Sequence, residues 1–196
     1  MAQTQRLILA SGSAARRTLL QKAGLSFEVV PSGFVEPGPE ACTEPRSFVQ
    51  NMAWMKAFHV AQKRKTDEVI LAADSIVWHQ GKAILKPVDE TDAHKILSSL
   101  AGTVHELWTG VCFWRCSDQL QFAWQELSRV QMKRLTTNEL DALIATGAWQ
   151  DKSGGYGIQE EGLDPFLTVI EGTVSNVIGL PMESLVRILP MVMQRP

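Results

Sequence analysis

Two serines, a glycine and an arginine follow the first apolar segment of the chain. The stretch LASGSAARRTLL spans residues 9–20, with Ser11 and Ser13 on either side of Gly12. A helix that begins here would present unpaired backbone N–H groups and partial positive charge, and Arg16 would lie one turn inside it. These groups can form a phosphate cradle. A Ser-Gly-Ser stretch by itself is more often a helix cap with solvated arginines beside it, and this one matches neither a Walker A loop nor GxGxxG.

A carboxylate and two lysines could complete such a site. The apolar run VILAAD, residues 69–74, places Asp74 at the end of a predicted buried strand. Ligands of α/β sheets bind at the carboxyl ends of strands, although an aspartate that forms a turn with Ser75 has equal weight. Lys56 emerges from an otherwise apolar helical face, where snorkelling to solvent is the common outcome. Lys86, in the sequence ILKP, is equally ambiguous alone.

Two further segments carry polar groups that could meet a ligand. Glu36 lies in a segment rich in proline and glycine, residues 31–45, and is a second carboxylate for a hard cation such as magnesium. The sequence DKSGGYGIQ, residues 151–159, combines three glycines with Lys152 and Gln159. This segment is either a tight structural turn or a backbone wall that lies against a flat ligand.

The composition narrows the class of protein. The chain has 196 residues, 45% hydrophobic and 20% charged side chains, and a formal net charge of −2, which is typical of one globular domain. A chain with this charge has no basic field for nucleic acid, and no apolar run approaches the ~20 residues of a membrane helix. Three scattered cysteines do not form a secreted disulfide framework, and the four histidines lack metal-ligand spacing. We therefore expect a cytoplasmic protein that binds neither nucleic acid nor a membrane.

The elements that must position these residues alternate between strands and helices. Apolar runs predict strands at 6–10, 27–30, 69–74 and 166–170, and helical patterns with caps predict helices at 14–23, 45–63, 91–100, 137–145 and after Pro181. A hairpin is expected around residues 79–82, and two long antiparallel strands at 106–116 and 120–135 with a turn near 117–118. The predicted fold is α/β, with a mixed central sheet flanked by helices and an antiparallel β-rich lobe.

Five ordered stretches resemble motifs of the Maf family of nucleoside triphosphate pyrophosphatases. They are LILASGSAARRTLL, NMAWMKA, LAADSIVWHQGKAILKP, HELWTGV, and DKSGGYGIQ with SNVIGLP. The resemblance implies an enzyme that hydrolyses a nucleoside triphosphate to the monophosphate and pyrophosphate with a divalent cation, Mg²⁺ or Mn²⁺. It also implies one elongated, two-lobed domain over residues 1–196 with a central cleft. The family's motif residues fall on Ser11, Ser13, Arg16, Glu36, Lys56, Asp74, Lys86 and Gln159.

The resemblance and the residue chemistry agree on roles. Asp74 matches the family's catalytic base, which would order or deprotonate water. Lys56 and Lys86 would neutralise the charge that builds on phosphorus, and Glu36 would hold the metal with Asp74. The phosphate oxygens would be held by Ser11, Ser13 and Arg16.

The choice of base is predicted less directly. Members of the family that prefer dTTP and UTP resemble S-x-S-P-R-R, whereas this chain has Ala14 and Ala15 in place of the proline and the first arginine. Those members also have a threonine where this chain has Ser75. Gln159 is the residue that these members also have at the corresponding position. We expect Ser75 and Gln159 to bind substrate, with relaxed specificity that leans to pyrimidine or modified nucleotides.

A regulator of cell division or septum formation that binds nucleotides without hydrolysing them is the alternative function. The combination of Asp74, Lys56 and Lys86 disfavours it, because a pure binder needs no base beside two lysines. The expected partner is the nucleoside triphosphate, and a homodimer is compatible with the sequence.

Overall fold

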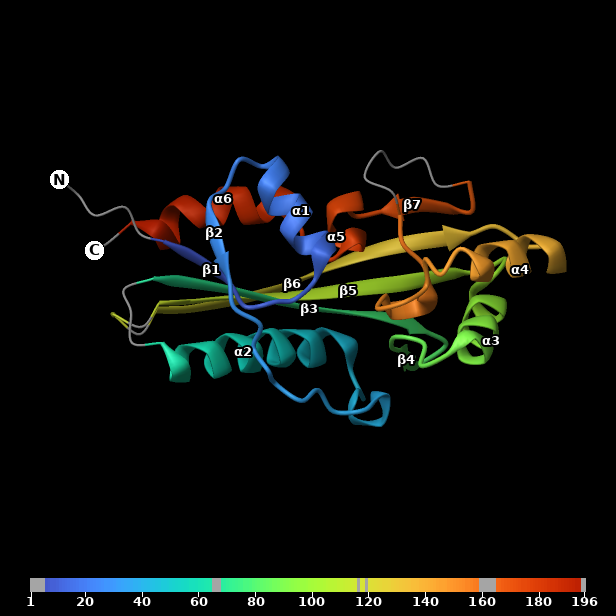
Figure 1. Cartoon of the computed structure of the whole chain (residues 1–196), viewed down its shortest axis with the longest axis horizontal. Helices are drawn as coiled ribbons and strands as arrows, with labels where there is room; N and C mark the ends of the chain where they lie inside the picture. The colour runs from blue at the N-terminus through green and yellow to red at the C-terminus, as the bar shows by residue number, and fades with distance from the viewer. Residues whose placement is uncertain (1–5, 65–67, 116, 119, 159–164, 195–196) are drawn as a thin grey trace.

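One mixed sheet runs along the long axis of the molecule (Figure 1). The structure is a computed structural model, and it describes residues 6–64, 68–115, 117–118, 120–158 and 165–194. The strand order is β2-β1-β3-β5-β6-β7, with β4 paired to β3. The strands are β1 Leu7–Leu9, β2 Phe27–Val29, β3 Val69–His79, β4 Lys82–Ile84, β5 Val104–Arg115, β6 Leu120–Met132 and β7 Leu167–Glu171. The sheet is parallel through β2, β1 and β3 and antiparallel in its other pairings.

Helices cover both faces of this sheet. They are α1 Ala14–Lys22, α2 Pro45–Lys63, α3 Glu90–Leu100, α4 Thr137–Ala145, α5 Val174–Ile178 and α6 Met182–Met193, with short 3-10 turns η1 Pro39–Ala41 and η2 Ser153–Gly155. Helix α2 lies on one face, and α1, α5 and α6 lie on the other (Figure 1). None of the helices in the described part of the chain combines the length and the apolar character that crossing a membrane requires.

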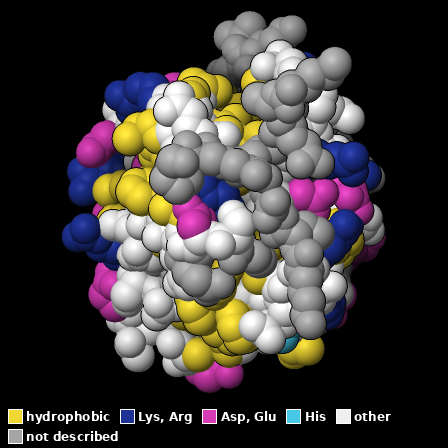
Figure 2. Space-filling view, turned by 90° about the vertical axis from the view of Figure 1, so that its left-hand side faces the viewer, with side chains coloured by type: hydrophobic (Ala, Val, Ile, Leu, Met, Phe, Trp, Pro, Cys, Tyr) yellow, Lys and Arg dark blue, Asp and Glu magenta, His cyan; other side chains and the backbone are white. Residues whose placement is uncertain are grey.

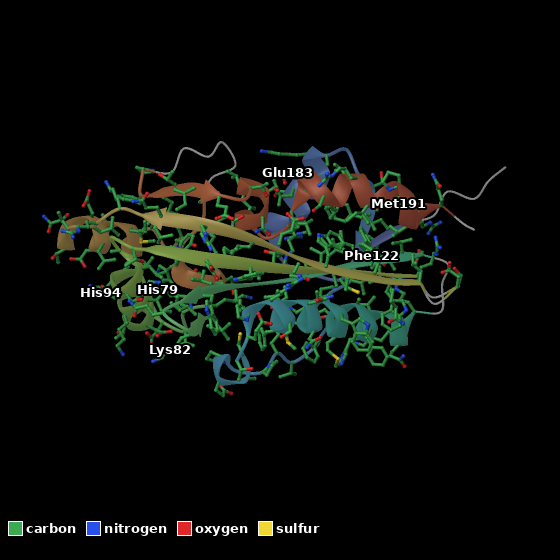
Figure 3. All side chains as sticks on the ribbon, turned by 180° about the vertical axis from the view of Figure 1, so that it is seen from behind. His79, Lys82, His94, Phe122, Glu183 and Met191 are labelled. Carbon is green, nitrogen blue, oxygen red and sulfur yellow. The ribbon has the colours of Figure 1, made fainter. Side chains whose placement is uncertain are left out.

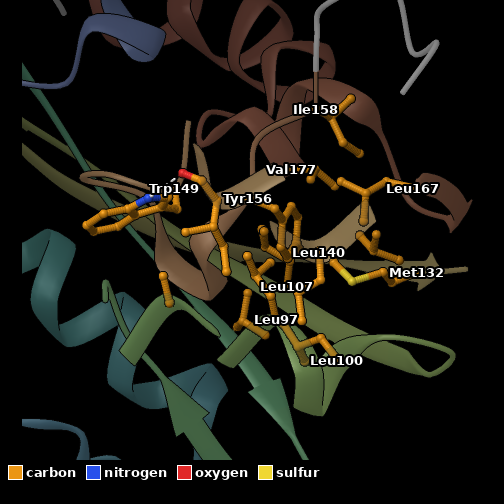
Figure 4. Close-up of a cluster of buried hydrophobic side chains, with 14 residues drawn as sticks. Leu97, Leu100, Leu107, Met132, Leu140, Trp149, Tyr156, Ile158, Leu167 and Val177 are labelled. Carbon is orange, nitrogen blue, oxygen red and sulfur yellow. Dashed lines mark hydrogen bonds between the residues drawn. The ribbon is translucent and has the colours of Figure 1, made fainter. Parts of the chain in front are cut away.

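Alternation along the strands distributes the core between the two faces. Leu9 and Leu71 pack with residues of α1 and α6, whereas Ile8 and Ile70 pack with residues of α2. Successive side chains of a strand point to opposite faces, so a continuous apolar run supplies both layers. A third cluster closes the far end, where Tyr156 lies among apolar side chains of α3, α4 and β5 (Figure 4).

The structure confirms the predicted α/β class and most of the predicted elements. Helices α1, α2 and α4 begin where the sequence predicts, because Ser13 and Thr136 cap the first and last of these and Pro45 occupies the first turn of α2. The hairpin and the two long strands are present. The short helix α5 was not predicted.

The prediction that the buried strand ends at Asp74 is wrong. Strand β3 continues to His79, because β5 pairs with it as far as Trp78. Strand β1, its parallel neighbour, pairs with it only as far as Leu71. Asp74 therefore lies inside a strand, just beyond the carboxyl end of the parallel part of the sheet.

Surface charge is mixed on the end of the molecule that Figure 2 shows. Lysine and arginine side chains alternate there with carboxylates, and apolar side chains lie between them. On this face, neither sign of charge gathers into one field, as the small net charge of the chain leads one to expect.

Candidate active site

A pocket of about 460 Å³ brings most of the predicted site residues together. Its polar side chains come from α1, α2, β3 and the segments before α2 and after β4. They are Ser13, Arg16, Glu36, Lys56, Asp74, Ser75 and Lys86, with Ala15 beside them, and the glycine-rich segment adds Asp151, Lys152 and Ser153. The lining also contains apolar side chains, which include Phe48, Leu107, Tyr156, Ile158 and Val177. Gln159 lies outside the described residues.

The centre of the polar group is a lysine shared by two carboxylates. Lys56 Nζ lies 2.5 Å from Asp74 Oδ1 and 2.7 Å from Glu36 Oε1. Lys56 and Asp74 are only 7% and 5% exposed. Snorkelling to solvent, the common outcome for a lysine on an apolar face, does not occur here. Charges buried to this degree persist in proteins when they are paired, and each partner here satisfies the other.

A glycine on the neighbouring strand allows α2 to approach this closely. Gly110 of β5 is paired directly with Asp74, and a Cβ atom at Gly110 would lie 2.1 Å from the carbonyl oxygen of Val49 on α2. Any side chain at this position would push the helix away from the sheet. The sequence motif HELWTGV includes Gly110, but the contact with α2 is made across the fold and has no local signal.

Arg16 is fixed by three segments of the chain. Its Nε donates to the carbonyl of Gly179 at 2.8 Å, Nη1 donates to the Ser11 hydroxyl at 3.1 Å, and Nη2 donates to the Ser75 hydroxyl at 3.2 Å. Burial lowers the pKa of Arg16, and the negative charges of Asp74 and Glu36 oppose this shift. The guanidinium carries five N–H donors, so these bonds leave donors for a ligand.

Glu36 approaches the site from the segment between β2 and α2. Partial burial opposes ionisation of its side chain, but the charges of Lys56, Lys86 and Arg16 outweigh this effect and hold the pKa of Glu36 below its ordinary value. The side chain is 43% exposed, so solvent can reach the carboxylate.

Two carboxylates among the described residues meet closely enough to hold a metal ion together. Glu36 and Asp74 converge on one point, where the Lys56 ammonium lies. Among the described residues, no group of three or more histidine, cysteine or acidic side chains is placed to hold a metal. A set of two carboxylates fits a hard cation that takes its other ligands from water and substrate phosphates.

The glycine-rich segment contains both a structural turn and part of the pocket wall. Gly154 has a φ of 77°, and a Cβ atom there would lie 2.8 Å from Val77 Cγ2. A Cβ atom at Gly155 would lie 3.2 Å from Pro87 Cγ. These two glycines allow tight packing within the protein, whereas Tyr156 and Gly157 face the pocket.

Sequence reasoning missed the residues behind Ser75. The Ser75 and Thr109 hydroxyls lie 2.8 Å apart, and Thr109 donates to the carbonyl of Asn176 at 3.3 Å. Thr109 and Asn176 are fully buried. Both lie in sequence motifs, HELWTGV and SNVIGLP, but no local pattern indicates that these motifs meet near Ser75.

The comparison with known families agrees with the resemblance of the motifs. A family model described as Maf-like protein matches residues 6–192. The chain belongs to the Maf-like protein family. This Maf-like chain is 39% identical to the dTTP/UTP pyrophosphatase of Bacillus cereus strain ATCC 10987 / NRS 248, over 93% of the chain and 88% of that relative. It is 37% identical to a protein of the same name from Bacillus anthracis, over 93% of both.

A solved structure resembles the Maf-like fold over nearly its whole length. The HAM1 protein from Coxiella burnetii superposes with a TM-score of 0.53 at 14% sequence identity, over 95% of this chain and 99% of that chain. At this level of identity, the likeness concerns the arrangement of the strands and helices alone.

Proposed function

We propose that this Maf-like protein hydrolyses nucleoside triphosphates to the nucleoside monophosphate and pyrophosphate. The observation that carries the proposal is the buried contact of Lys56 with Asp74 and Glu36, in a pocket that also holds Arg16 and Lys86. A carboxylate and several cations around one cavity suit attack of water on a polyanion. The relatives named dTTP/UTP pyrophosphatase support the same reaction.

The triphosphate would bind at the cationic part of the pocket. Arg16 has donors left after its three bonds within the protein, and the first turn of α1 adds backbone N–H groups near Ser13. Lys86 is exposed at the pocket, so its ammonium group can contact the phosphates of a bound nucleotide. Ser11 acts through Arg16, because its hydroxyl accepts a hydrogen bond from that guanidinium.

Asp74 would act on the attacking water. A carboxylate has two oxygens, so one can accept from Lys56 while the other accepts a proton from water. The water oxygen forms a bond to the α-phosphorus, and the bond from that phosphorus to the bridging oxygen breaks. Pyrophosphate leaves, and the charge that develops on the phosphoryl oxygens is stabilised by Lys56 and Arg16.

Glu36 and Asp74 would hold the divalent cation, Mg²⁺ or Mn²⁺. These two carboxylates would be its protein ligands, and the cation would supply positive charge that offsets the charge of the phosphates. Because the Lys56 ammonium lies between these carboxylates in the protein alone, its position is expected to adjust when the cation binds.

The substrate base is proposed to be a pyrimidine, as in dTTP and UTP, or a modified base. The names of the relatives support this choice. The sequence predicts specificity positions at Ala15, Ser75 and Gln159, and of these we propose Ala15 and Gln159. Ser75 also lines the pocket, but its hydroxyl accepts a hydrogen bond from Arg16, which links it to the phosphate part of the ligand. We further propose that residues 1–196 form one domain, which the single sheet of the described residues supports. A cytoplasmic location is proposed from the sequence alone.

A substrate panel tests the proposal. Purified protein would be assayed on each nucleoside triphosphate with Mg²⁺ or Mn²⁺, measuring pyrophosphate and orthophosphate separately, with Asp74→Asn as the control. Pyrophosphate that appears with the wild type and is lost in the variant supports the enzyme. Tight binding without turnover by the wild type would support a regulator instead.

A further inference from the structure

Tyr156 forms part of the apolar wall of the pocket. It directly follows η2, is 5% exposed, and lines the pocket together with Leu107 and Ile158. Packing around its ring is tight, since a Cβ atom at Gly154 would lie 2.9 Å from Tyr156 Cε1. Apart from its hydroxyl group, the side chain lies among hydrophobic neighbours (Figure 4).

The hydroxyl of Tyr156 has a dedicated partner. It is joined by a hydrogen bond of 2.6 Å to Nε2 of His105, which lies on β5 and is 1% exposed. His79, which lies on β3 at the end of the molecule opposite Phe122 (Figure 3), contacts the His105 ring edge-on at a centroid distance of 6.3 Å. A polar pair inside an apolar cluster fixes one orientation of the groups it joins, which apolar packing alone does not do.

Both partners are neutral near neutral pH. Burial lowers the pKa of His105 to about 4, and the charge of His79 acts in the same direction. Burial also raises the pKa of Tyr156. The hydrogen bond therefore joins an uncharged imidazole to an uncharged phenol.

We infer that His105 is a positioning residue that holds the Tyr156 ring in place as the surface against which the substrate's nucleobase packs. This inference rests on the proposed function, which places the triphosphate among Arg16, Lys56 and Lys86. A nucleotide bound there would extend its base toward the apolar lining of the same pocket. Aromatic rings are favoured partners for the faces of bases.

Loss of the imidazole should affect the nucleoside part of the ligand and spare the phosphates. In His105→Phe, the Tyr156 hydroxyl stays buried without its partner, so the ring is displaced. We expect KM for dTTP to rise roughly tenfold, which corresponds to the loss of one buried hydrogen bond. The inhibition constant of inorganic tripolyphosphate should change less than about twofold, because this ligand has no base to pack against the ring.

A second substitution separates positioning from general damage. In the double variant His105→Phe and Tyr156→Phe, both partners are apolar and no buried polar group is left unpaired. The free energy of unfolding should therefore return toward the wild-type value, whereas KM for dTTP should stay raised, because the hydrogen bond that positions the ring is still absent. Tyr156→Phe alone should raise KM in the same direction, and it tests the inference if His105→Phe fails to fold. His94→Phe, the same change at an exposed site on α3, is the matched control and should behave as wild type.

The results that would overturn the inference are equally specific. One is an unchanged KM in folded His105→Phe, and another is an equal loss of affinity for tripolyphosphate and dTTP. If the wild type hydrolyses no triphosphate, the proposed function fails. Calorimetric binding of dTTP and tripolyphosphate to the same variants then tests His105 independently.

Discussion

The ammonium of Lys56 on α2 lies 2.5 Å from a carboxylate oxygen of Asp74 on β3, with both side chains buried. Taking two charges out of water costs more than their attraction commonly returns, so such a pair contributes little net stability compared with apolar side chains. Buried charges that converge on a pocket are a mark of functional sites. The pair is therefore better explained by chemistry than by folding.

Substitution of Asp74 tests that explanation. Asp74→Asn keeps the shape of the side chain and removes its charge, so the water is no longer deprotonated. We expect kcat for triphosphate hydrolysis to fall by a factor of roughly 100 or more. Binding of a non-hydrolysable triphosphate, measured by calorimetry, should persist. Activity within tenfold of the wild type in the folded variant would remove Asp74 from the proposed role.

Substitution of Gly110 tests whether the close approach of α2 to the sheet is needed for stability and activity. Gly110→Ala places a methyl group 2.1 Å from the Val49 carbonyl oxygen, so the helix must move away from the sheet. We expect a loss of about 1–3 kcal/mol in the free energy of unfolding together with reduced activity, because Lys56 moves with the helix. Gly147→Ala is the control, because Gly147 has a φ of 67° but open space where the added carbon would lie. This control should cost about 1 kcal/mol and leave activity unchanged.

Protonation of Glu36 should make the free energy of unfolding depend on pH in the acid range. Its pKa in the folded protein lies below the ordinary 4.5, so the carboxylate stabilises the fold above pH 4.5, and this contribution is lost as the pH falls through the folded pKa. The side chain is 43% exposed, which limits the effect to about 1 kcal/mol or less. Denaturant unfolding of the wild type and Glu36→Gln should differ near pH 7 and converge in acid. If the difference in the free energy of unfolding between the two proteins grew as the pH fell, this expectation would be contradicted.

Substitution of Ser75 should lower the activity on all nucleoside triphosphates by the same factor. Its hydroxyl contacts Arg16 and Thr109, so Ser75→Ala removes an acceptor from the guanidinium that is proposed to hold phosphate. We expect a loss of about 3- to 30-fold in kcat/KM, equal across dTTP, UTP and the purine triphosphates. Assays on the four ribonucleotides and dTTP measure it. A loss confined to one base would instead place Ser75 at the base and support the specificity role predicted from sequence.

Local patterns predicted the helices and strands well, because caps and apolar periodicity are written in neighbouring residues. Pro45 and Lys63 bound α2 as predicted, and Ser13 caps α1. Asp74 misled the prediction of β3, since a carboxylate usually ends an apolar run. Here Lys56 satisfies it inside the strand.

The side-chain contacts that the sequence did not predict are made between segments far apart in the chain. Nothing near Gly110 reveals that the Val49 carbonyl lies above it, and nothing near Tyr156 reveals His105. The resemblance of the motifs identified the family, which the comparison confirmed. The placement of each side chain in the pocket required the folded chain.

The three hydrogen bonds of Arg16 join Ser11, Ser75 and Gly179, which lie near the beginning, middle and end of the chain. Anchoring of this kind makes the proposed ligand a contributor to folding, since any anion that binds only the assembled guanidinium shifts the equilibrium toward the folded chain. Thermal unfolding at rising concentrations of a non-hydrolysable triphosphate measures the shift. The lifetime of the protein against proteases would then follow the supply of its own substrate.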